Sequence, residues 1–515
     1  MARRARGAVA AAAPMIARLN AGLAARPALR AALAFVAGAA AVGGFAPLEQ
    51  PLVALAACIV LVHLWQHAPS PRAAFGVGFW FGLGLFGVGV SWVFVSLHRF
   101  GGMPAPLAGI ATLGFCAYLA LYPACAGWLQ ARAPGPAWAR AALVVPAAWT
   151  VLEWMRGWAL TGFPWLAMGY AAIDTPLAGY APLGGVTLLS LVVLACAGAL
   201  WCLVSGVGRA QAAVAVGLIV AAGAALQTVR WTTPVGVPTH VTLLQGNVPQ
   251  DLKFDPARYA HTLETYAQLA ELSQARLIVM PETALPRFLD LVEPAYVARL
   301  EAVGRRNGGD LLVGVPLRDA NGRYTNSVIS LGSSPRQAYH KVHLVPFGEF
   351  VPPGFGWVMR WLSVPLADFS SGARDQPRLE VAGQRIAVNV CYEDAFGTEI
   401  ARALPAATLL VNVSNVAWFG DSLAPAQHLE IARMRALETG RMVLTATNTG
   451  ITAAIGADGA VLARLPQFAQ GRLELAALAF RGATPFVQLG NSLALALSAL
   501  LLAAALLVAR AQRSR

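Results

Sequence analysis

The sequence predicts a polytopic α-helical membrane protein with one soluble domain inserted before its last membrane span. Hydrophobic residues make up 57% of the 515 residues, charged residues make up only 12%, and the mean hydropathy is +0.58. These values are far from those of a soluble chain of this length. A helix needs about 20 apolar residues to cross a bilayer core of ~30 Å. About eight stretches meet or approach that requirement: 31–47, 50–66, 73–97, 103–129, 139–155, 180–205, 210–228 and 489–509.

The segment between Gln227 and Gly490 differs from the rest, because its charge density is ordinary and it is long enough for one sizeable domain. Apolar residues recur at helical spacing in 259–272 and again in 429–437. Short apolar runs predict buried strands around these helices: Val241–Leu244, Leu277–Met280, Leu311–Val315, Ile386–Val390, Leu409–Val413 and Met442–Thr445. This alternation indicates an α/β layered sandwich.

We therefore expect a membrane domain of about seven spans in residues 1–228, a soluble domain in 229–487, and the last span with its tail in 488–515. The net charge of +13 lies in the membrane part, because residues 229–487 carry 23 Lys and Arg against 22 Asp and Glu. Basic residues retained in the cytoplasm orient the helices. With eight spans, the arginine clusters share one side, both termini are cytoplasmic, and the soluble domain is extracytoplasmic. No basic patch for nucleic acid is needed, so nucleic acid is not an expected partner.

The first residues resemble a signal peptide, with an Arg-rich start and an apolar run from Ala8 to Ala17. Arg18, Arg26 and Arg30 then interrupt the apolar pattern, and a polytopic protein can use its first true span for targeting. We therefore expect no cleavage.

Cys391 is the one cysteine of six that lies outside a strongly apolar stretch, at the end of a strand-like run. The others fall where a thiol is more often a small buried apolar group; they are Cys58, Cys116, Cys125, Cys196 and Cys202. Upstream of Cys391, Glu282 closely follows a predicted strand, and Lys341 lies on or beside one. A carboxylate, an ammonium and a thiol form a known set for acyl transfer, so Cys391 is a candidate nucleophile.

Two motif matches are better explained in other ways. Gly82-Leu-Gly84-Leu-Phe-Gly87 has the dinucleotide-binding pattern G-x-G-x-x-G, but it lies in a predicted membrane helix with no preceding strand, which indicates close helix packing. His340 and His343 flank Lys341, but two histidines without a third ligand nearby are weak evidence for zinc. No metal ion or cofactor is expected.

The soluble domain contains an ordered set of motifs that resembles the carbon–nitrogen hydrolase (nitrilase) superfamily: Pro-Glu282-Thr, His-Lys341-Val-His-Leu-Val-Pro-Phe-Gly-Glu349-Phe and Val-Cys391-Tyr-Glu393. More narrowly, the whole chain is similar to the apolipoprotein N-acyltransferase family of the bacterial inner membrane. The motifs behind this narrower match are Gly44-Phe-Ala-Pro47, Glu153-Trp-Met-Arg156-Gly-Trp158-Ala-Leu-Thr-Gly162-Phe-Pro164-Trp165, Leu244-Gln-Gly-Asn247-Val-Pro-Gln250 and Asn412-Val-Ser-Asn415-Val-Ala-Trp418-Phe-Gly420-Asp421.

The resemblance implies a nitrilase-like α/β/β/α sandwich on the periplasmic side of the inner (cytoplasmic) membrane, and a two-step transfer. Glu282 would be the general base for Cys391, which takes an acyl chain from a phospholipid such as phosphatidylethanolamine as a thioester. The free α-amine of the N-terminal S-diacylglyceryl-cysteine of an apolipoprotein would then accept the acyl chain. Lys341, with the backbone N–H of Tyr392, would stabilise the oxyanion. Glu349 would hold Lys341, while Tyr392, Glu393 and Trp418 would shape the pocket.

Lysine is scarce in this chain, which strengthens the expectation for Lys341. Among 38 basic residues only Lys253 and Lys341 are lysines, so a compact ammonium is expected where lysine is retained. The chain departs from the family at Phe254, where a tryptophan is common. The aromatic face is kept and the indole N–H is lost.

Two other classes of protein fit part of the pattern. A membrane-anchored nitrilase-type amidase would use the same three catalytic residues, but an anchor needs only one span. A transporter with an accessory domain would place ionisable residues in several spans, whereas Glu153 is the only clear one, near a span end beside Arg156. Acyl transfer is therefore the favoured function.

Overall fold

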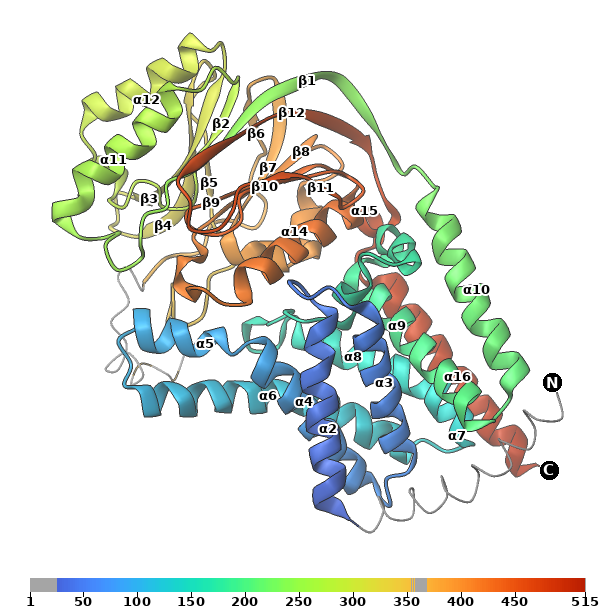
Figure 1. Ribbon diagram of the computed structural model, residues 1–515. Helices are drawn as coiled ribbons and strands as arrows, with labels where there is room; N and C mark the ends of the chain where they lie inside the picture. Colours follow the sequence, from blue (N-terminus) through green and yellow to red (C-terminus); the bar gives the residue numbers. More distant parts are fainter. Residues whose placement is uncertain (1–25, 353, 355, 357–367, 515) are drawn as a thin grey trace.

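The computed structural model describes residues 26–514 except 353, 355 and 357–367. The signal-peptide-like start of the chain therefore lies outside the described residues. A bundle of apolar helices lies on one side of the molecule, and a domain built on two β-sheets lies on the other (Figure 1). The helix α2 begins, and α16 ends, on the side of the bundle that faces away from the sheets.

Six helical segments among the described residues are long and apolar enough to cross a membrane. They are α2 with the turn η1 (Pro27–Gly44), α4 (Pro71–Gly89), α6 (Ala105–Arg132), η6 with α9 (Pro176–Ser205), α10 (Arg209–Gln227) and α16 (Ser492–Arg513). The other two predicted spans correspond to shorter elements. The stretch 50–66 forms α3 (Pro51–Gln66), and 139–155 falls in α7 (Ala137–Ala139), η3 (Arg140–Val144) and α8 (Val145–Arg156). The chain is a polytopic membrane protein.

Glycines allow the membrane helices to approach closely. A methyl group on Gly84 of α4 would lie 2.1 Å from the carbonyl oxygen of Phe35 in α2, and one on Gly82 would lie 2.7 Å from Cα of Ala120 in α6. Neither distance is possible for a real side chain, so α4 needs glycine on both faces. Gly82 and Gly84 of the G-x-G-x-x-G match therefore serve close helix packing, as the sequence predicted, whereas a methyl group on Gly87 would meet nothing within 4 Å.

The other domain consists of two six-stranded sheets. The first has the order β12-β1-β2-β3-β4-β5, and its strands are β1 (Thr232–Gln245), β2 (Leu277–Val279), β3 (Asp310–Arg318), β4 (Tyr324–Gly332), β5 (Ala338–His340) and β12 (Gly471–Gly482). The second has the order β11-β10-β9-β8-β7-β6, with β6 (Leu379–Val381), β7 (Gln384–Val390), β8 (Leu409–Ser414), β9 (Val443–Thr447), β10 (Ala453–Ile455) and β11 (Val461–Arg464). All six predicted strands are present. The other six are short, lie at edges or alternate only weakly in hydropathy.

The two sheets pack face to face, and helices cover both outer faces. Leu243 and Val279 of the first sheet share one buried apolar cluster with Val388 and Val411 of the second. The helices α11 (Pro256–Glu271) and α12 (Pro294–Arg306) pack on the first sheet. On the second sheet lies α14 (Ala424–Thr439), between that sheet and the membrane helices (Figure 1). This is the predicted α/β/β/α sandwich.

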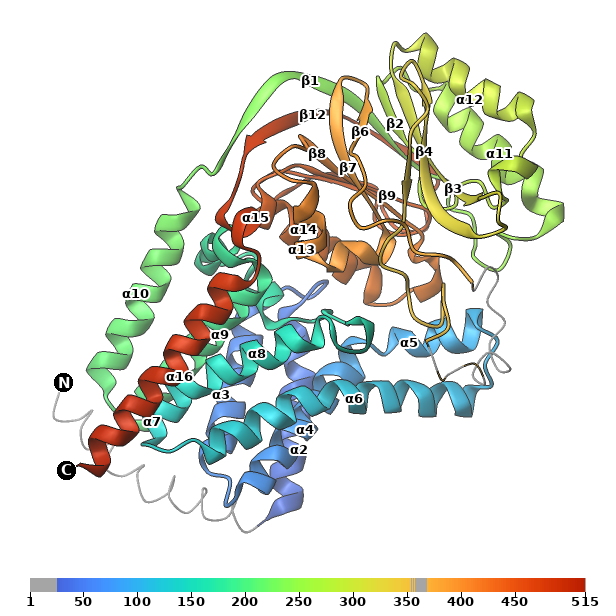
Figure 2. The same ribbon diagram turned by 180° about the vertical axis from the view of Figure 1, so that it is seen from behind.

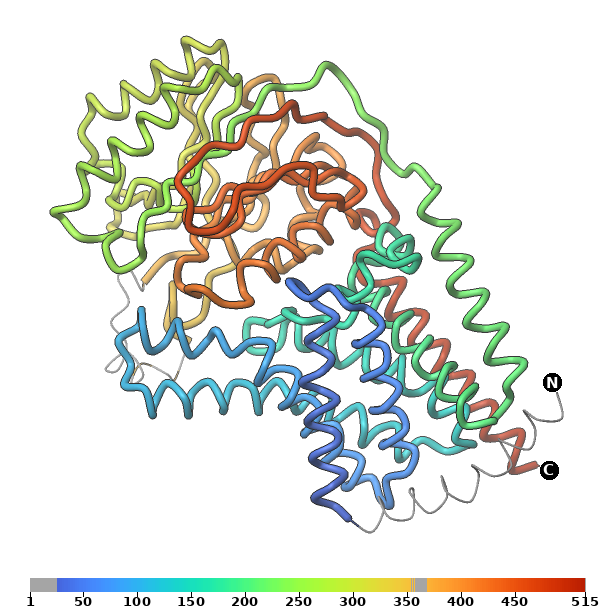
Figure 3. Tube along the Cα trace, viewed as in Figure 1, coloured from blue at the N-terminus to red at the C-terminus, as the bar shows by residue number. Residues whose placement is uncertain are grey.

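The sandwich is inserted between two membrane helices through a pair of neighbouring strands. The chain leaves α10 in β1 and returns along β12 to α15 (Pro485–Leu489) and α16 (Figure 3). The two strands are antiparallel, with Thr232 opposite Gly482 and Gln245 opposite Gly471. Seen from behind, α10 and α16 lie beside α9 (Figure 2). The points at which the chain enters and leaves the sandwich therefore lie next to each other, and the sandwich has apolar cores of its own.

Candidate active site

The three predicted catalytic residues come from strand ends of both sheets. Cys391 directly follows β7, Lys341 directly follows β5, and Glu282 lies three residues after β2. The strands β7, β8 and β9 are parallel, as are β1, β2 and β3 at the centre of the first sheet. Ligand sites in such sheets form at the carboxyl ends of parallel strands, where loops leave a rigid scaffold.

Cys391 has a backbone conformation that is rare for a non-glycine residue. Its φ is +53°, in the left-handed region, and it begins the turn η9 (Cys391–Ala395). Two side chains hold this turn through its backbone, because Asn412 Nδ2 and His428 Nε2 each lie 3.3 Å from the Cys391 carbonyl oxygen. The conformation is thus fixed by surrounding contacts, as is common for strained backbone at a functional site.

The Glu282 carboxylate is buried, and both of its oxygens accept hydrogen bonds. Oε1 accepts from Asn326 Nδ2 at 2.7 Å and lies 3.5 Å from Lys341 Nζ. Oε2 accepts from the backbone N–H of Asn415 at 2.8 Å. Glu282 is 7% exposed and Lys341 is 1% exposed, so this ion pair lies in a low-dielectric environment where charges act strongly.

Glu349 forms the other half of the ion-pair arrangement around Lys341. Its Oε1 accepts from Lys341 Nζ at 2.8 Å and from Asn326 Nδ2 at 2.8 Å. Its Oε2 accepts from the backbone N–H of Val345 at 2.9 Å. Asn326 therefore bridges the two carboxylates, and Lys341 lies between them.

The electrostatic environment favours a protonated thiol beside an ionised carboxylate. Burial raises the pKa of the Cys391 thiol, and the charge of Glu282 raises it further. Burial would also raise the pKa of Glu282, but Lys341 and Lys253 hold this pKa below its usual value. Burial opposes the charge of Lys341, yet Glu349 and Glu282 raise its pKa overall. At rest the proton is therefore on sulfur and Glu282 is ionised, which are the protonation states that a general base for this thiol requires.

Glu393 supports the site from behind. Its Oε1 lies 2.7 Å from the Val342 backbone nitrogen and 3.1 Å from that of His343, and its Oε2 lies 2.7 Å from the Val390 backbone nitrogen. The Tyr339 hydroxyl also donates to this carboxylate. Burial raises the pKa of Glu393. Glu393 thus ties the segment after Lys341 to the end of β7.

Trp418 and Phe254 lie on loops around the site. Trp418 is in the turn η11 (Val416–Phe419) and is half-buried. Its carbonyl accepts from Ser96 Oγ at 2.8 Å, and its ring lies edge-on to Phe100 at 6.2 Å. Phe254 is half-buried in the loop that precedes α11. Both aromatic residues therefore have part of their surface available.

His340 and His343 have different neighbours, which does not suggest a shared ligand. Nδ1 of His340 lies 2.9 Å from the hydroxyl oxygens of both Thr325 and Ser327. Nδ1 of His343 lies 3.2 Å from Glu399. The two rings therefore belong to separate hydrogen-bond networks.

The membrane domain contacts the site through a strained loop. The Tyr392 hydroxyl donates to the carbonyl of Gly162 at 2.9 Å, and His343 Nε2 lies 3.0 Å from the carbonyl oxygen of Thr161. Thr161 and Gly162 have φ of +78° and +86°. The residue that follows Cys391 thus touches the membrane domain directly.

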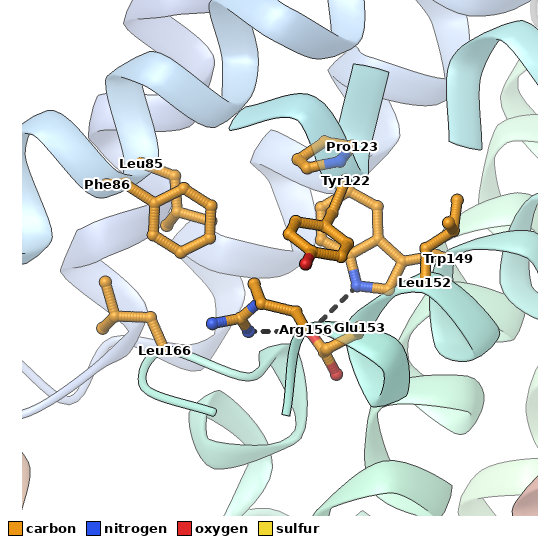
Figure 4. Close-up of a pocket in the computed structure, with 9 residues that line it drawn as sticks. All are labelled: Leu85, Phe86, Tyr122, Pro123, Trp149, Leu152, Glu153, Arg156 and Leu166. Atoms are coloured by element: carbon orange, nitrogen blue, oxygen red, sulfur yellow. Dashed lines mark hydrogen bonds and ion pairs between the residues drawn. The ribbon is translucent and has the colours of Figure 1, made fainter. Parts of the chain in front are cut away.

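Glu153 and Arg156 form a buried charged pair in the membrane domain (Figure 4), and Arg156 binds this loop. Arg156 lies 3.9 Å from Glu153, whose Oε2 also accepts from the Trp149 indole at 3.0 Å. Arg156 Nη1 donates to the carbonyls of Phe163 at 2.5 Å and Trp165 at 2.6 Å. Glu153 and Arg156, which the sequence placed at a span end, therefore shape the loop that meets Tyr392.

Four further residues complete the polar environment of the site: Lys253, Asn326, Asn415 and His428. No role was predicted for any of them from the sequence. The scarcity of lysine could have pointed to Lys253, and the family motif that contains Asn415 could have pointed to that residue. Asn326 and His428 had no signal, because a lone Asn in a strand and a lone His in a helix are common structural residues.

The fold and the site together define a class of protein, a carbon–nitrogen hydrolase domain inserted into a bundle of membrane helices. Residues 240–482 match the model of the carbon–nitrogen hydrolase family, and residues 37–199 match that of the apolipoprotein N-acyltransferase N-terminal domain. The crystal structure of a carbon–nitrogen hydrolase from Helicobacter pylori G27 aligns with 47% of this chain and 89% of its own, at 18% identity and a TM-score of 0.35.

Full-length relatives give the narrower assignment. The apolipoprotein N-acyltransferase of Nitrosomonas europaea is 47% identical over 487 residues, which cover 94% of this chain and 98% of the relative. That of Methylococcus capsulatus is 46% identical over 88% of this chain and 91% of the relative. The chain belongs to the apolipoprotein N-acyltransferase family.

Proposed function

We propose that the protein transfers an acyl chain from a phospholipid to the free α-amine of the N-terminal S-diacylglyceryl-cysteine of bacterial apolipoproteins. The proposal is carried by three observations at one site. Lys341 Nζ lies 3.5 Å from Glu282 Oε1, the charges of both residues act on the Cys391 thiol, and Tyr392, next to Cys391, contacts the membrane domain. Family membership supplies the substrate class, because relatives that match nearly the whole chain are named apolipoprotein N-acyltransferases.

In the first step, Glu282 takes the proton of the Cys391 thiol as sulfur attacks the ester carbonyl of the phospholipid. Lys341 and the backbone N–H of Tyr392 stabilise the tetrahedral oxyanion. The C–O bond then breaks, and Glu282 returns the proton to the leaving alkoxide. A thioester on Cys391 and a lysophospholipid remain.

In the second step, the neutral α-amine of the apolipoprotein attacks the thioester carbonyl. Glu282 accepts the proton of the attacking amine, and the C–S bond breaks as the amide forms. The proton returns to sulfur, so the enzyme regains its starting state. Glu349 keeps Lys341 in place throughout, since its carboxylate lies 2.8 Å from Lys341 Nζ.

We further propose that the protein lies in the bacterial inner membrane with the sandwich in the periplasm. The arginine distribution supports this orientation, and both α2 and α16 have their outer ends away from the sandwich. In a variant without native cysteines, a cysteine at position 140 should react only with reagents that reach the cytoplasm. One at position 321 should react from the periplasm. Labelling of both from one side would contradict this orientation.

The two-step order can be tested by mass spectrometry of the purified protein. Phospholipid alone should add an acyl group to Cys391 and release lysophospholipid. A lipopeptide with a free N-terminal amine should then remove the acyl group, whereas its N-acetylated form should not. If lysophospholipid appears only after lipopeptide is added, the two-step order is wrong. Rapid loss of the acyl group to water would indicate a hydrolase instead.

A further inference from the structure

The two lysines of this chain lie at the same buried site. Of the 38 basic residues, 36 are arginines, yet Lys253 and Lys341 are both close enough to Glu282 to lower its pKa. Lys253 is 3% exposed and Lys341 is 1% exposed. A chain that otherwise uses arginine has therefore kept lysine only around its candidate general base.

Lys253 holds the turn that carries Glu282. Its Nζ donates to the carbonyl oxygen of Glu282 at 3.1 Å and to Thr283 Oγ1 at 2.5 Å. Thr283 has a φ of +46°, which is unfavourable for a β-branched residue. An ammonium that binds both residues of this turn stabilises a conformation that the sequence alone would disfavour.

The loop of Lys253 is attached on the opposite side of Glu282 as well. Gln250 Oε1 accepts from Asn415 Nδ2 at 2.7 Å, and the backbone N–H of Asn415 donates to Glu282 Oε2. Lys253 and Gln250 therefore hold Glu282 from two directions. Movement of this loop would displace the carboxylate itself.

The charges around Glu282 balance only when Lys253 is counted. The titratable groups near Glu282 are Lys341, Lys253, Glu349, Cys391 and His428. With a protonated thiol and a neutral imidazole, two carboxylates face two ammonium groups. Proton transfer from Cys391 to Glu282 leaves that sum at zero. The Glu393 carboxylate interacts with Lys341 and is not among the groups that shift the pKa of Glu282 most; four hydrogen-bond donors stabilise its charge.

Without Lys253 the same buried cluster would carry a net charge of −1 before and after the proton transfer, which is costly in a low dielectric. Burial lowers the pKa of Lys253 to about 8, although Glu282 and Cys391 raise it. Lys253 is therefore mostly an ammonium at neutral pH. A guanidinium is larger and planar, so it would not fit between a carbonyl and a hydroxyl in the same way.

We propose that Lys253 is the second cation of the active site, a positioning residue whose ammonium offsets the charge of Glu282 and fixes the Glu282–Thr283 turn. The proposal rests on the proposed role of Glu282 as the base for Cys391. The loop that carries Lys253 and Phe254 would thus position Glu282, in addition to supplying an aromatic side chain.

The test is the pH dependence of thioester formation in single turnovers of the full-length protein with phospholipid. Removing the charge in Lys253→Met raises the pKa of Glu282, so the acid limb of the profile should move to higher pH by on the order of one unit. At pH values below the limb, thioester formation should be about tenfold slower in Lys253→Met than in the wild type. Thr283→Val removes one acceptor and keeps the charge, so it should slow the reaction without moving the limb. Asp251→Asn, an exposed charge change in the same loop, should alter neither.

An unchanged acid limb in folded Lys253→Met would overturn the proposal. If that variant does not fold, Lys253→Gln decides instead, because it keeps a hydrogen-bond donor and lacks the charge. Alkylation of Cys391 by iodoacetamide gives a readout that needs no acyl donor, and it should be slower in the lysine variants than in the wild type. Absence of a thioester in the wild type would contradict the proposed function, whereas equal alkylation rates would contradict the role of Lys253.

Discussion

Replacing Glu282 with glutamine should damage both catalysis and folding, for two separate reasons. The carboxylate faces donors at both oxygens, namely Asn326 Nδ2 and Lys341 Nζ at Oε1 and the Asn415 backbone N–H at Oε2. In whichever orientation the amide is placed, its NH₂ group would face a donor. The mismatch leaves buried groups without a partner, which costs about 1–3 kcal/mol of unfolding free energy.

Asn326 can relieve part of this mismatch only by losing another contact. If its amide turned, Oδ1 could accept from the new glutamine, but Nδ2 would no longer donate to Glu349. The stability loss should therefore persist. Loss of the proposed base should also slow thioester formation by about 10²–10⁴-fold, the usual contribution of general acid–base catalysis.

The assay combines thermal unfolding of the purified protein with the rate at which phospholipid acylates Cys391. Glu474→Gln is the matched control, since the same substitution is made at an exposed residue of β12, and it should leave both values unchanged. A Glu282→Gln protein as stable and as active as the wild type would refute the reasoning. Lower stability with normal acylation would refute only the catalytic role.

Three further outcomes are expected. Lys341→Arg should slow thioester formation about 10²–10³-fold, nearly as much as Lys341→Ala, because Lys341 is 1% exposed and its Nζ fits between two carboxylates. Gln427→Leu should lower the thermal unfolding temperature, because Gln427 accepts from the indoles of Trp92 and Trp165, and each unpaired buried group costs about 1–3 kcal/mol. Glu430→Gln should flatten the stability curve between pH 4.5 and 8, because burial raises the pKa of Glu430 from 4.5 to about 8. Its protonated form stabilises the fold below its unfolded pKa, and this contribution is lost as the pH rises through about 8.

Each of these three predictions has a result that would contradict it or a control substitution elsewhere in the chain. Near-normal thioester formation in Lys341→Arg would contradict the need for a compact ammonium. Gln268→Leu, at an exposed position of α11, should leave the unfolding temperature unchanged. The Glu430 interpretation is wrong if stability falls with rising pH equally in the wild type and the variant.

From the sequence alone we could predict the membrane class, the inserted α/β sandwich and the three catalytic candidates. These features depend on local patterns: hydropathy over about 20 residues, short apolar runs, and motifs of a few residues around Glu282, Lys341 and Cys391. The six predicted runs are buried and mostly apolar, which is why they were visible in the sequence. Edge strands such as β6 and β11 have only three and four residues, which is too short for a pattern to be seen.

The three-dimensional packing shows which distant side chains surround Glu282 and Cys391, and which ones join the sandwich to the membrane domain. Asn326 meets Glu282 from 44 residues away, and His428 reaches the carbonyl of Cys391 from 37 residues away. Gln427 binds the indole of Trp165, which lies 262 residues earlier in the chain. Such contacts depend on the pairing order of two sheets and on the docking of α14 on the membrane domain, and no local pattern encodes them. Single buried polar residues become recognisable as functional only when their partners are known, because an isolated Asn, Gln or His in a sequence has many structural uses.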